Sequence, residues 1–380
     1  MWTKFNGNLS RFVLRRSLTD LKSAVFQRDK QLPLYPHVHL IGAPVRRGQP
    51  NDGTHLGPRM IRESNVIQSL KSVGITVEDH GDIALEQDDP KDDSPIYNMI
   101  NPRSFVDTTE KIATNVEHLL RSTTSSSQLP TSPLVVIGGD HSMATGTILG
   151  HWRVKPNICI IWVDSHGDLN TPFTCVCGNM HGFPLAFLLK EIQDEMPHVK
   201  EMESIEPCLT ASDIVYIGLR DLDPHEVYDL RKNNIKHFTM MDVDRMGIEA
   251  VIQEAIHSVN PRLDRPIHLS FDIDAMDPSI APSTGTPVPG GLTLREGLRI
   301  CEEVYATGKL SMLDLAELNP MIGTPEDVSK TQATALSLLK TCLGYNRSGH
   351  LPKKVHLLRE EGIPSRADKL ESTKRATYTT

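Results

Sequence analysis

Residues 158–168 read ICIIWVDSHGD, an apolar run that ends in two acids and a histidine. A continuous apolar run of this length predicts a β-strand covered on both faces, as in a parallel sheet. Two other segments repeat the arrangement: LVVIGGDHS at 134–142 and IHLSFDIDAMDP at 267–278. We therefore expect three buried strands that each carry acids or histidines where they leave the sheet.

Outside these segments, short apolar runs alternate with helical patterns, which predicts a parallel α/β sheet. The predicted strands are 38–43, 75–78, 134–138, 158–163, 213–218, 235–239, 267–273 and 309–315, and the clearest helices are 107–122, 182–194, 243–259, 293–306 and 326–343. Alternation alone does not distinguish an eight-stranded barrel from an open sheet. In both architectures, ligand-binding residues lie at the carboxyl ends of the strands.

The acids and histidines at these strand ends indicate a metal site. Asp164, His166 and Asp168 alternate, as do Asp272 and Asp274, so extended backbone presents each set to one side. Buried carboxylates are costly unless they are paired or bound to a metal. The set is rich in carboxylates and contains no thiolate, which favours manganese over a cysteine-type zinc site. A single Asp at a strand end is more often a helix cap or turn residue, so the prediction depends on the combination.

Composition excludes several classes of protein. The 380 residues are 38% hydrophobic and 23% charged, enough for a sizeable core, and the formal net charge of -8 argues against a nucleic-acid partner. The sequence contains no run of 18 consecutive apolar residues, so we expect no membrane-spanning helix. The six cysteines are sparse and are expected to be reduced thiols; Cys175 and Cys177 form CxC, with no second pair to build a zinc site.

The two ends differ from the middle of the chain. Residues 1–28 contain six Lys or Arg and the single acid Asp20, among apolar residues such as Phe12 and Leu14. This composition is typical of a mitochondrial transit peptide, although a solvated extension of residues 1–30 is the alternative. Residues 351–380 are polar and are expected to form a mobile tail. We therefore favour the mitochondrial matrix over the cytoplasm as the location.

The motifs resemble those of the ureohydrolase family, which includes arginases and agmatinases. GGDHS at 138–142, DSHGD at 164–168 and SFDIDAMDPSIAPSTGTPVPGG at 270–291 are similar to the family's long motifs and occur in the same order. The resemblance covers roughly 36–347 and implies a catalytic domain at 36–350. It also implies a three-layer α-β-α fold with an open eight-stranded parallel sheet, which decides the point that alternation left open.

The resemblance further implies a pair of manganese ions. One would be held by His141, Asp164, Asp168 and Asp272, and the other by Asp164, His166, Asp272 and Asp274. The implied reaction is hydrolysis of L-arginine to L-ornithine and urea, by attack of a hydroxide that bridges the two ions on the guanidinium carbon. Asp168 would orient that hydroxide, and His181 would carry protons.

Three stretches resemble arginase in particular: DLNTPFTCVCGNMHG at 168–182, GLRDLDPHE at 218–226 and DLAELNP at 314–320. The implied substrate-binding residues are Asn170, Cys177, Asp221, Asp223, Glu226, Thr286 and Glu317. Asn170 would contact the α-carboxylate, Asp223 the α-amino group with Glu226 as a nearby helper, and Glu317 the guanidinium. Cys177 departs from the family, which has Ser there, and a thiol is a weaker donor than a hydroxyl.

Other functions remain open. An agmatinase-like amidinohydrolase is the main alternative, although agmatinases tend to carry Glu where this chain has Val288. A non-catalytic relative would be expected to lack a metal ligand, and a deacetylase of related fold would hold one metal. The resemblance also implies a homotrimer, with Arg347 matching an interface residue.

Overall fold

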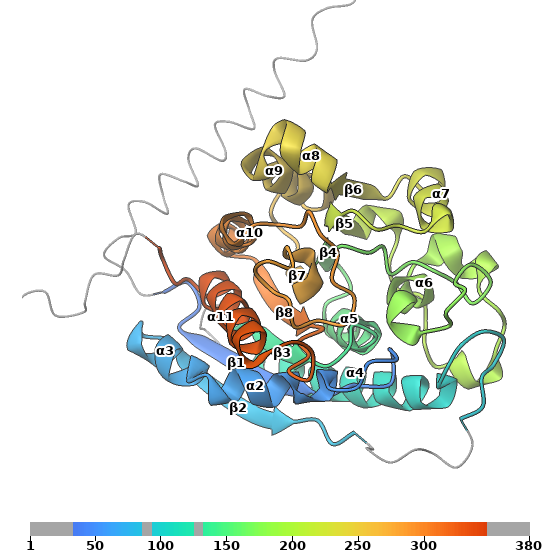
Figure 1. Cartoon of the computed structure of the whole chain (residues 1–380), viewed down its shortest axis with the longest axis horizontal. Helices are drawn as coiled ribbons and strands as arrows, with labels where there is room; N and C mark the ends of the chain where they lie inside the picture. The colour runs from blue at the N-terminus through green and yellow to red at the C-terminus, as the bar shows by residue number, and fades with distance from the viewer. Residues whose placement is uncertain (1–32, 86–92, 125–131, 348–380) are drawn as a thin grey trace, which may run out of the picture. The chain divides into compact units, whose positions relative to one another are not determined.

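The computed structural model describes residues 33–85, 93–124 and 132–347, and they form one sheet with helices on both faces (Figure 1). The eight parallel strands follow the order β2-β1-β3-β8-β7-β4-β5-β6. They are β1 (His37–Ala43), β2 (Thr76–Asp82), β3 (Leu134–Gly138), β4 (Cys159–Val163), β5 (Ile214–Leu219), β6 (Lys236–Thr239), β7 (Ile267–Asp272) and β8 (Leu310–Ala316). The sheet is open, as the family resemblance implied.

Helices cover the sheet in two layers. Contacts join α4 (Pro102–Thr124), α5 (Met143–Val154) and α6 (Pro184–Leu188) on one face. Contacts on the other face link α2 (Gly57–Glu63), α3 (Val66–Ser72), α8 (Met240–Met246), α9 (Ile248–Val259), α10 (Leu294–Thr307) and α11 (Pro325–Cys342). The remaining α-helix, α7 (Pro224–Lys232), connects β5 to β6. Among the residues that the structure describes, no helix has the length and apolar character needed to cross a bilayer.

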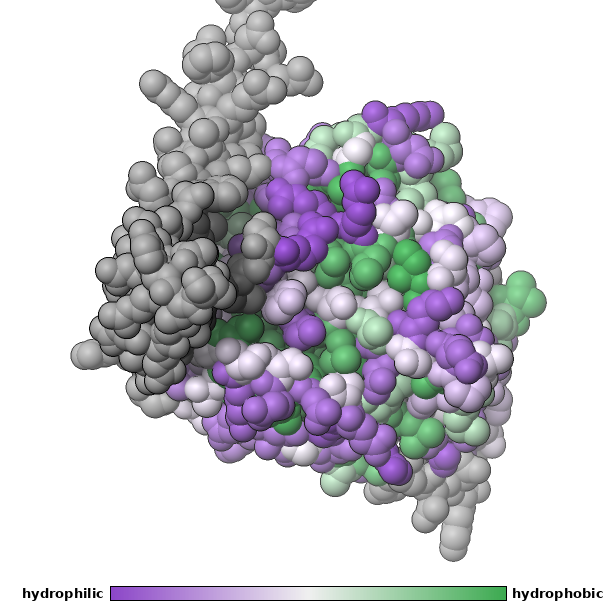
Figure 2. Space-filling model, turned by 60° about the vertical axis from the view of Figure 1, so that its left-hand side comes forward, coloured by the Kyte–Doolittle hydropathy of each residue, from purple (hydrophilic) through white to green (hydrophobic). Residues whose placement is uncertain are grey.

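Alternate residues of β3 and β4 enter separate hydrophobic cores. In β4, Cys159, Ile161 and Val163 pack in one core, whereas Ile160 and Trp162 pack in another. Both sets are fully buried. This two-sided burial explains why β3 and β4 are continuous apolar runs in the sequence. The outer faces of the helices are more polar, and the face in Figure 2 mixes hydrophilic side chains with smaller hydrophobic areas.

The eight predicted strands are all present, with ends shifted by one or a few residues. The predicted helix 243–259 is wrong as one element, because Gly247 at φ 75° separates α8 from α9. The predicted helix 182–194 is also two elements, α6 and the 3₁₀ helix η3 (Lys190–Glu195). Residues Leu32–Gly344 group into one unit that contains the whole sheet. The predicted extension at 1–30 and tail at 351–380 lie outside the described residues.

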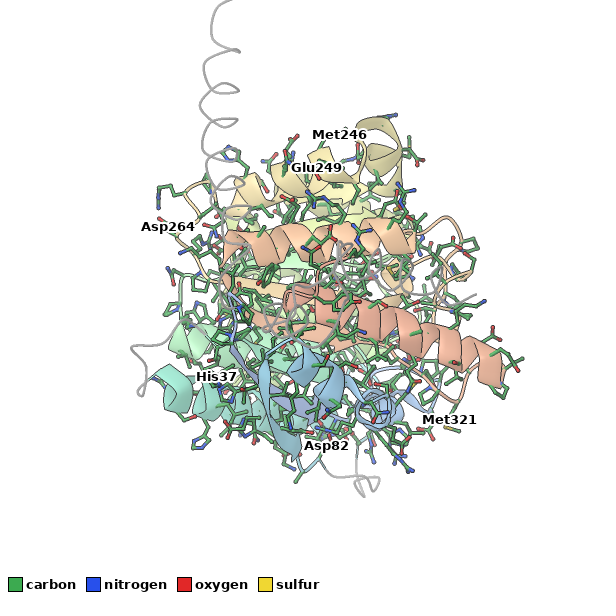
Figure 3. The ribbon with its side chains drawn as sticks, turned by 90° about the vertical axis from the view of Figure 1, so that its left-hand side faces the viewer. His37, Asp82, Met246, Glu249, Asp264 and Met321 are labelled. Carbon is green, nitrogen blue, oxygen red and sulfur yellow. The ribbon has the colours of Figure 1, made fainter. Side chains whose placement is uncertain are left out.

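The parallel strands all point the same way, which sets the position of the functional site. In Figure 3, His37 at the start of β1 and Asp264 before β7 lie on one side, and Met321 beyond the end of β8 lies on the other. The neighbours β3, β8, β7 and β4 are the four central strands. Their carboxyl ends therefore meet at one edge, where parallel α/β sheets bind ligands.

Candidate metal centre and substrate site

The four central strands each deliver acids or histidines to the same edge of the sheet. Asp140 and His141 follow β3, the segment 164–168 follows β4, Asp272 ends β7, and Glu317 follows β8. All of these named side chains are buried. So many buried acids require partners, and the geometry of the cluster shows which partners they have.

One group surrounds the imidazole of His141. Its Nδ1 lies 3.1 Å from Asp164 Oδ2, 3.3 Å from Asp168 Oδ2 and 3.1 Å from Asp272 Oδ2. Ligand atoms that share one octahedral ion are roughly 3 Å apart, because each lies about 2.1 Å from the ion. The donor atoms of His141, Asp164 and Asp168 lie within 4.8 Å of one another, a spacing that could hold a metal ion, and Asp272 adjoins this group through His141.

A second group adjoins the first and shares Asp164 with it. His166 Nδ1 lies 3.1 Å from Asp274 Oδ2 and 3.6 Å from Asp164 Oδ1. The two oxygens of Asp164 thus face different imidazoles. Asp272 lies beside His141, and its Oδ1 accepts the backbone N–H of Asp274 at 2.8 Å. The predicted ligands come together as two adjoining sets, with Asp164 between them.

The charges in this cluster are unbalanced without a cation. Burial, followed by the charges of Asp274 and Asp164, raises the pKa of Asp272 well above its usual range. Burial and then the charge of Asp164 raise the pKa of Asp168 to about 6. Burial opposes charging of His141, but three facing carboxylates outweigh it and raise the pKa of that imidazole well above its usual value. Divalent cations would relieve this repulsion between carboxylates, so the donor set fits metal ions.

Further side chains hold the ligands in position, and the sequence analysis did not identify them. His141 Nε2 lies 2.9 Å from Ser270 Oγ, and its ring stacks on Trp162 at 4.1 Å. Trp162 Nε1 donates to Asp164 Oδ2 at 3.0 Å, and Ser165 Oγ donates to Asp274 Oδ1 at 2.7 Å. Ser270 and Trp162 each precede a ligand by two residues on a strand. Residues two apart on a strand point to the same face, so this spacing could have identified Ser270 and Trp162 from the sequence.

Two site residues adopt a left-handed backbone conformation that non-glycine residues rarely adopt. Asp168 has φ 51° and Glu317 has φ 62°. Backbone strain of this kind persists where surrounding contacts enforce it, and it concentrates at functional sites. In both residues it directs a buried carboxylate toward the cluster at the strand ends.

Glu317 connects the metal cluster to a second set of polar groups. Its Oε1 accepts the backbone N–H of His141 at 2.8 Å and lies 3.3 Å from His181 Nδ1. Its Oε2 accepts the side-chain amide of Gln49, whose own Oε1 is buried without a hydrogen-bond partner. Glu317 and nearby acids raise the pKa of His181 to about 9, against the opposing effect of burial. Gln49 was missed because it lies in the loop after β1, far from every motif.

Three other predicted substrate residues lie together in the segments that follow β4 and β5. Asn170 Nδ2 donates to Asp223 Oδ2 at 2.9 Å, and Asp223 is exposed. Buried Glu226 instead accepts backbone N–H groups, from Asp223 at 2.9 Å and Leu169 at 3.1 Å. Burial raises the pKa of Glu226 to about 8.

The remaining three predicted residues differ in their surroundings. Thr286 Oγ1 donates to Asp274 Oδ2 at 3.1 Å, so its hydroxyl lies against a candidate metal ligand. Exposed Asp221 lies 3.8 Å from His166 Nε2. Cys177 is exposed on the loop between Asn170 and His181. Among the described residues, no hydrogen bond joins Cys177 to Asn170.

Comparison with known proteins identifies the family. A family described as Arginase family matches residues 36–344, most of the chain. The chain belongs to the arginase family. Arginase-1 of Rattus norvegicus is 47% identical over 322 residues, which cover 84% of this chain and 97% of that protein. The mitochondrial Arginase-2 of Homo sapiens is 43% identical and covers 90% of this chain and 92% of its own.

Solved structures of the arginase family share this fold. The crystal structure of arginase from Bacillus subtilis has a TM-score of 0.70 and 32% identity, covering 82% of this chain and 99% of that one. A structure titled as a hypothetical agmatinase from Burkholderia thailandensis has a TM-score of 0.58 at 22% identity, which shows the fold alone. The protein is therefore an arginase-type ureohydrolase, an enzyme of a metal-dependent family with an open parallel sheet.

Proposed function

We propose that this arginase-family enzyme hydrolyses L-arginine to L-ornithine and urea with two manganese ions. The observation that carries the proposal is the pair of adjoining donor sets that share Asp164 and lie beside Glu317. His141, Asp164, Asp168 and Asp272 would hold one ion. Asp164, His166, Asp272 and Asp274 would hold the other. Donors that are mostly carboxylate oxygens suit manganese better than zinc.

Two such ions would lower the pKa of water enough to supply hydroxide near neutral pH. The chain's own residues then position the substrate. Glu317 would pair with the guanidinium, whose flat fork of N–H donors matches a carboxylate. Thr286, held against Asp274, would lie beside it. Asp168 would accept and return a proton at the reacting centre, and His181 would exchange protons with solvent, as an imidazole can.

Side chains in the loops after β4 and β5 would recognise the amino-acid end of the substrate. Asn170 and Cys177 would contact the α-carboxylate, and Asp223, with Asp221 nearby, would contact the α-amino group. Glu226 would act through Asp223, because its two oxygens accept the N–H groups of Asp223 and Leu169. Side chains that bind both the α-carboxylate and the α-amino group would favour an amino acid over a simple guanidine.

The deciding experiment measures urea release by the manganese-loaded protein, with L-arginine and agmatine assayed side by side. A strong preference for arginine supports the proposed contacts. A preference for agmatine would retain the metal chemistry and contradict the assignment of Asn170 to an α-carboxylate. No urea from either substrate would overturn the proposed reaction.

Replacing Asn170 with alanine should weaken arginine binding selectively. Loss of one hydrogen bond to a charged group raises the KM for arginine about ten- to hundredfold. Agmatine has no α-carboxylate, so the KM and kcat measured with agmatine should change little. Steady-state kinetics with both substrates check this, with thermal unfolding as the control for folding. An equal loss for both substrates would indicate a structural role for Asn170.

Cys177→Ser should lower the KM for arginine or leave it unchanged. A hydroxyl is a stronger donor than a thiol and fills less space, so it serves an α-carboxylate at least as well. The KM for arginine measures the effect. A large rise in KM would show that the thiol itself has a role in binding.

We also propose a homotrimer in the mitochondrial matrix, with the cytoplasm as the alternative location. The relatives include an Arginase-2 described as mitochondrial and several Arginase-1 proteins. Light scattering on the full chain should give three times the 42.3 kDa chain mass. A monomer mass would exclude the trimer. Cell fractionation with and without residues 1–30 tests the location.

A further inference from the structure

Two cysteines lie together on the loop that joins Asn170 to His181. Cys175 Sγ and Cys177 Sγ are 2.7 Å apart, about 0.7 Å longer than a disulfide bond. Cys175 is buried in an apolar cluster with Met180 and Phe183, whereas Cys177 is exposed. Between them, Val176 is 97% exposed, so the loop presents Cys177 to solvent while its partner is sheltered.

The surroundings of Cys177 favour its thiolate. Its hydrogen bond with Cys175 lowers the pKa of Cys177 to about 6 against the opposing effect of burial, with help from the backbone N–H of Asn179 and the charge of His181. The same hydrogen bond raises the pKa of Cys175, so Cys177 is the thiolate of the pair. Cys159 and Cys208 have no such partner thiol in the described part of the chain, and burial raises the pKa of each to about 12. Of the chain's six cysteines, five are buried and only Cys177 is exposed. An exposed thiolate beside a second thiol is the usual arrangement of a reactive and a resolving cysteine.

We propose that Cys175 and Cys177 are a reversible modification site that reacts with small-molecule disulfides of the glutathione type. The Cys177 thiolate attacks one sulfur of the external disulfide, forms a mixed disulfide and releases one thiolate. Cys175 Sγ then attacks Cys177 Sγ and breaks the bond between Cys177 and the small molecule, whose departing sulfur takes up the Cys175 proton and leaves as the second small thiol. Both cysteines are oxidised by two electrons in total, and one small-molecule disulfide is reduced to two thiols.

Closure of this disulfide alters the loop that carries the substrate contacts. The N–H groups of Gly178 and Asn179 donate to the two sulfurs at 3.3 Å and 3.5 Å, so a change at either sulfur reaches the backbone before His181. This consequence rests on the proposed function, whereas the modification itself does not. A displacement of about 1 Å in a catalytic group lowers efficiency up to about a hundredfold, so we expect kcat/KM for arginine to fall about ten- to hundredfold.

The test incubates the manganese-loaded full chain with oxidised glutathione, blocks free thiols with an alkylating reagent and maps the peptides by mass spectrometry. The expected product is a Cys175–Cys177 disulfide that dithiothreitol reverses, with the four other cysteines alkylated only after denaturation. Efficiency with arginine should fall and recover in parallel. In Cys175→Ser, glutathione should remain attached to Cys177, because no second thiol displaces it.

Two outcomes would overturn the proposal. One is a Cys177 that stays free after treatment or reacts no faster than the buried cysteines. The other is a glutathione adduct on Cys177 that persists in the unmodified chain as it does in Cys175→Ser. A disulfide that forms without any change in efficiency would overturn the link to catalysis. A reduced protein that releases no urea from arginine would contradict the proposed function, while the disulfide would still be visible by mass.

Discussion

Asp274→Ala should release almost no urea from arginine and should bind less than the full complement of manganese. Asp274 Oδ2 lies 3.1 Å from His166 Nδ1, and its other oxygen accepts from Ser165, so the side chain is central to the second donor set. Loss of a residue that merely orients a ligand costs about ten- to hundredfold in metal affinity or activity, and loss of a ligand should cost more. Urea release and metal content by mass spectrometry measure the two effects.

A matched control lies in the same motif. Asp277 accepts backbone N–H groups from Ser279, Gly290 and Gly291 and belongs to neither donor set. Asp277→Asn keeps one acceptor oxygen and gives up the hydrogen bonds at the other, so it should lose some stability but retain both manganese ions and most activity. Circular dichroism establishes that both variants are folded. A folded Asp274→Ala protein with two ions and the unmodified rate would exclude Asp274 as a ligand.

Glu317→Gln should lower kcat/KM for arginine about thirtyfold to several thousandfold, as expected when one partner of a buried charge pair is neutralised. The change removes the negative charge proposed to hold the guanidinium and keeps the shape of the side chain. Rotation of the Gln49 amide allows its unpaired Oε1 to accept from the new amide group, so the local structure is preserved.

Two further measurements separate binding from damage to the metal site. Glu317 belongs to neither donor set, so the manganese content of Glu317→Gln should stay at two ions per chain. The inhibition constant of a guanidinium-containing competitor should rise by a factor similar to that for kcat/KM. Loss of manganese would show instead that Glu317 supports the metal site through its hydrogen bond to the backbone of His141.

The central strands and the candidate ligands could be predicted because their signals are local. All of these strands are buried on both faces, and β3 and β4 are therefore continuous apolar runs, whereas β7 also carries buried His268 and Ser270. The acids and histidines follow at strand ends, which meet at one edge of a parallel sheet. The even spacing does not explain every direction, because Asp274 lies in the 3₁₀ helix η6 (Ile273–Ala275) and Asp168 has φ 51°. Helix α5 was not identified, because nine of its residues are buried and include polar Thr145 and Thr147, which obscures an amphipathic period. The break between α8 and α9 depends on one glycine, Gly247, in a region of otherwise helical pattern.

The sequence by itself determined the parallel α/β class, the positions of eight strands and the residues available for a metal. The tertiary structure decided the strand order, which places β3, β8, β7 and β4 side by side and so brings His141, Asp164 and Asp272 within hydrogen-bonding distance. It also decided that Gln49 contacts Glu317, which lies 268 positions away in the sequence. Strand runs and motifs depend on neighbouring residues, whereas these contacts depend on how distant segments pack, which spacing along the chain does not encode.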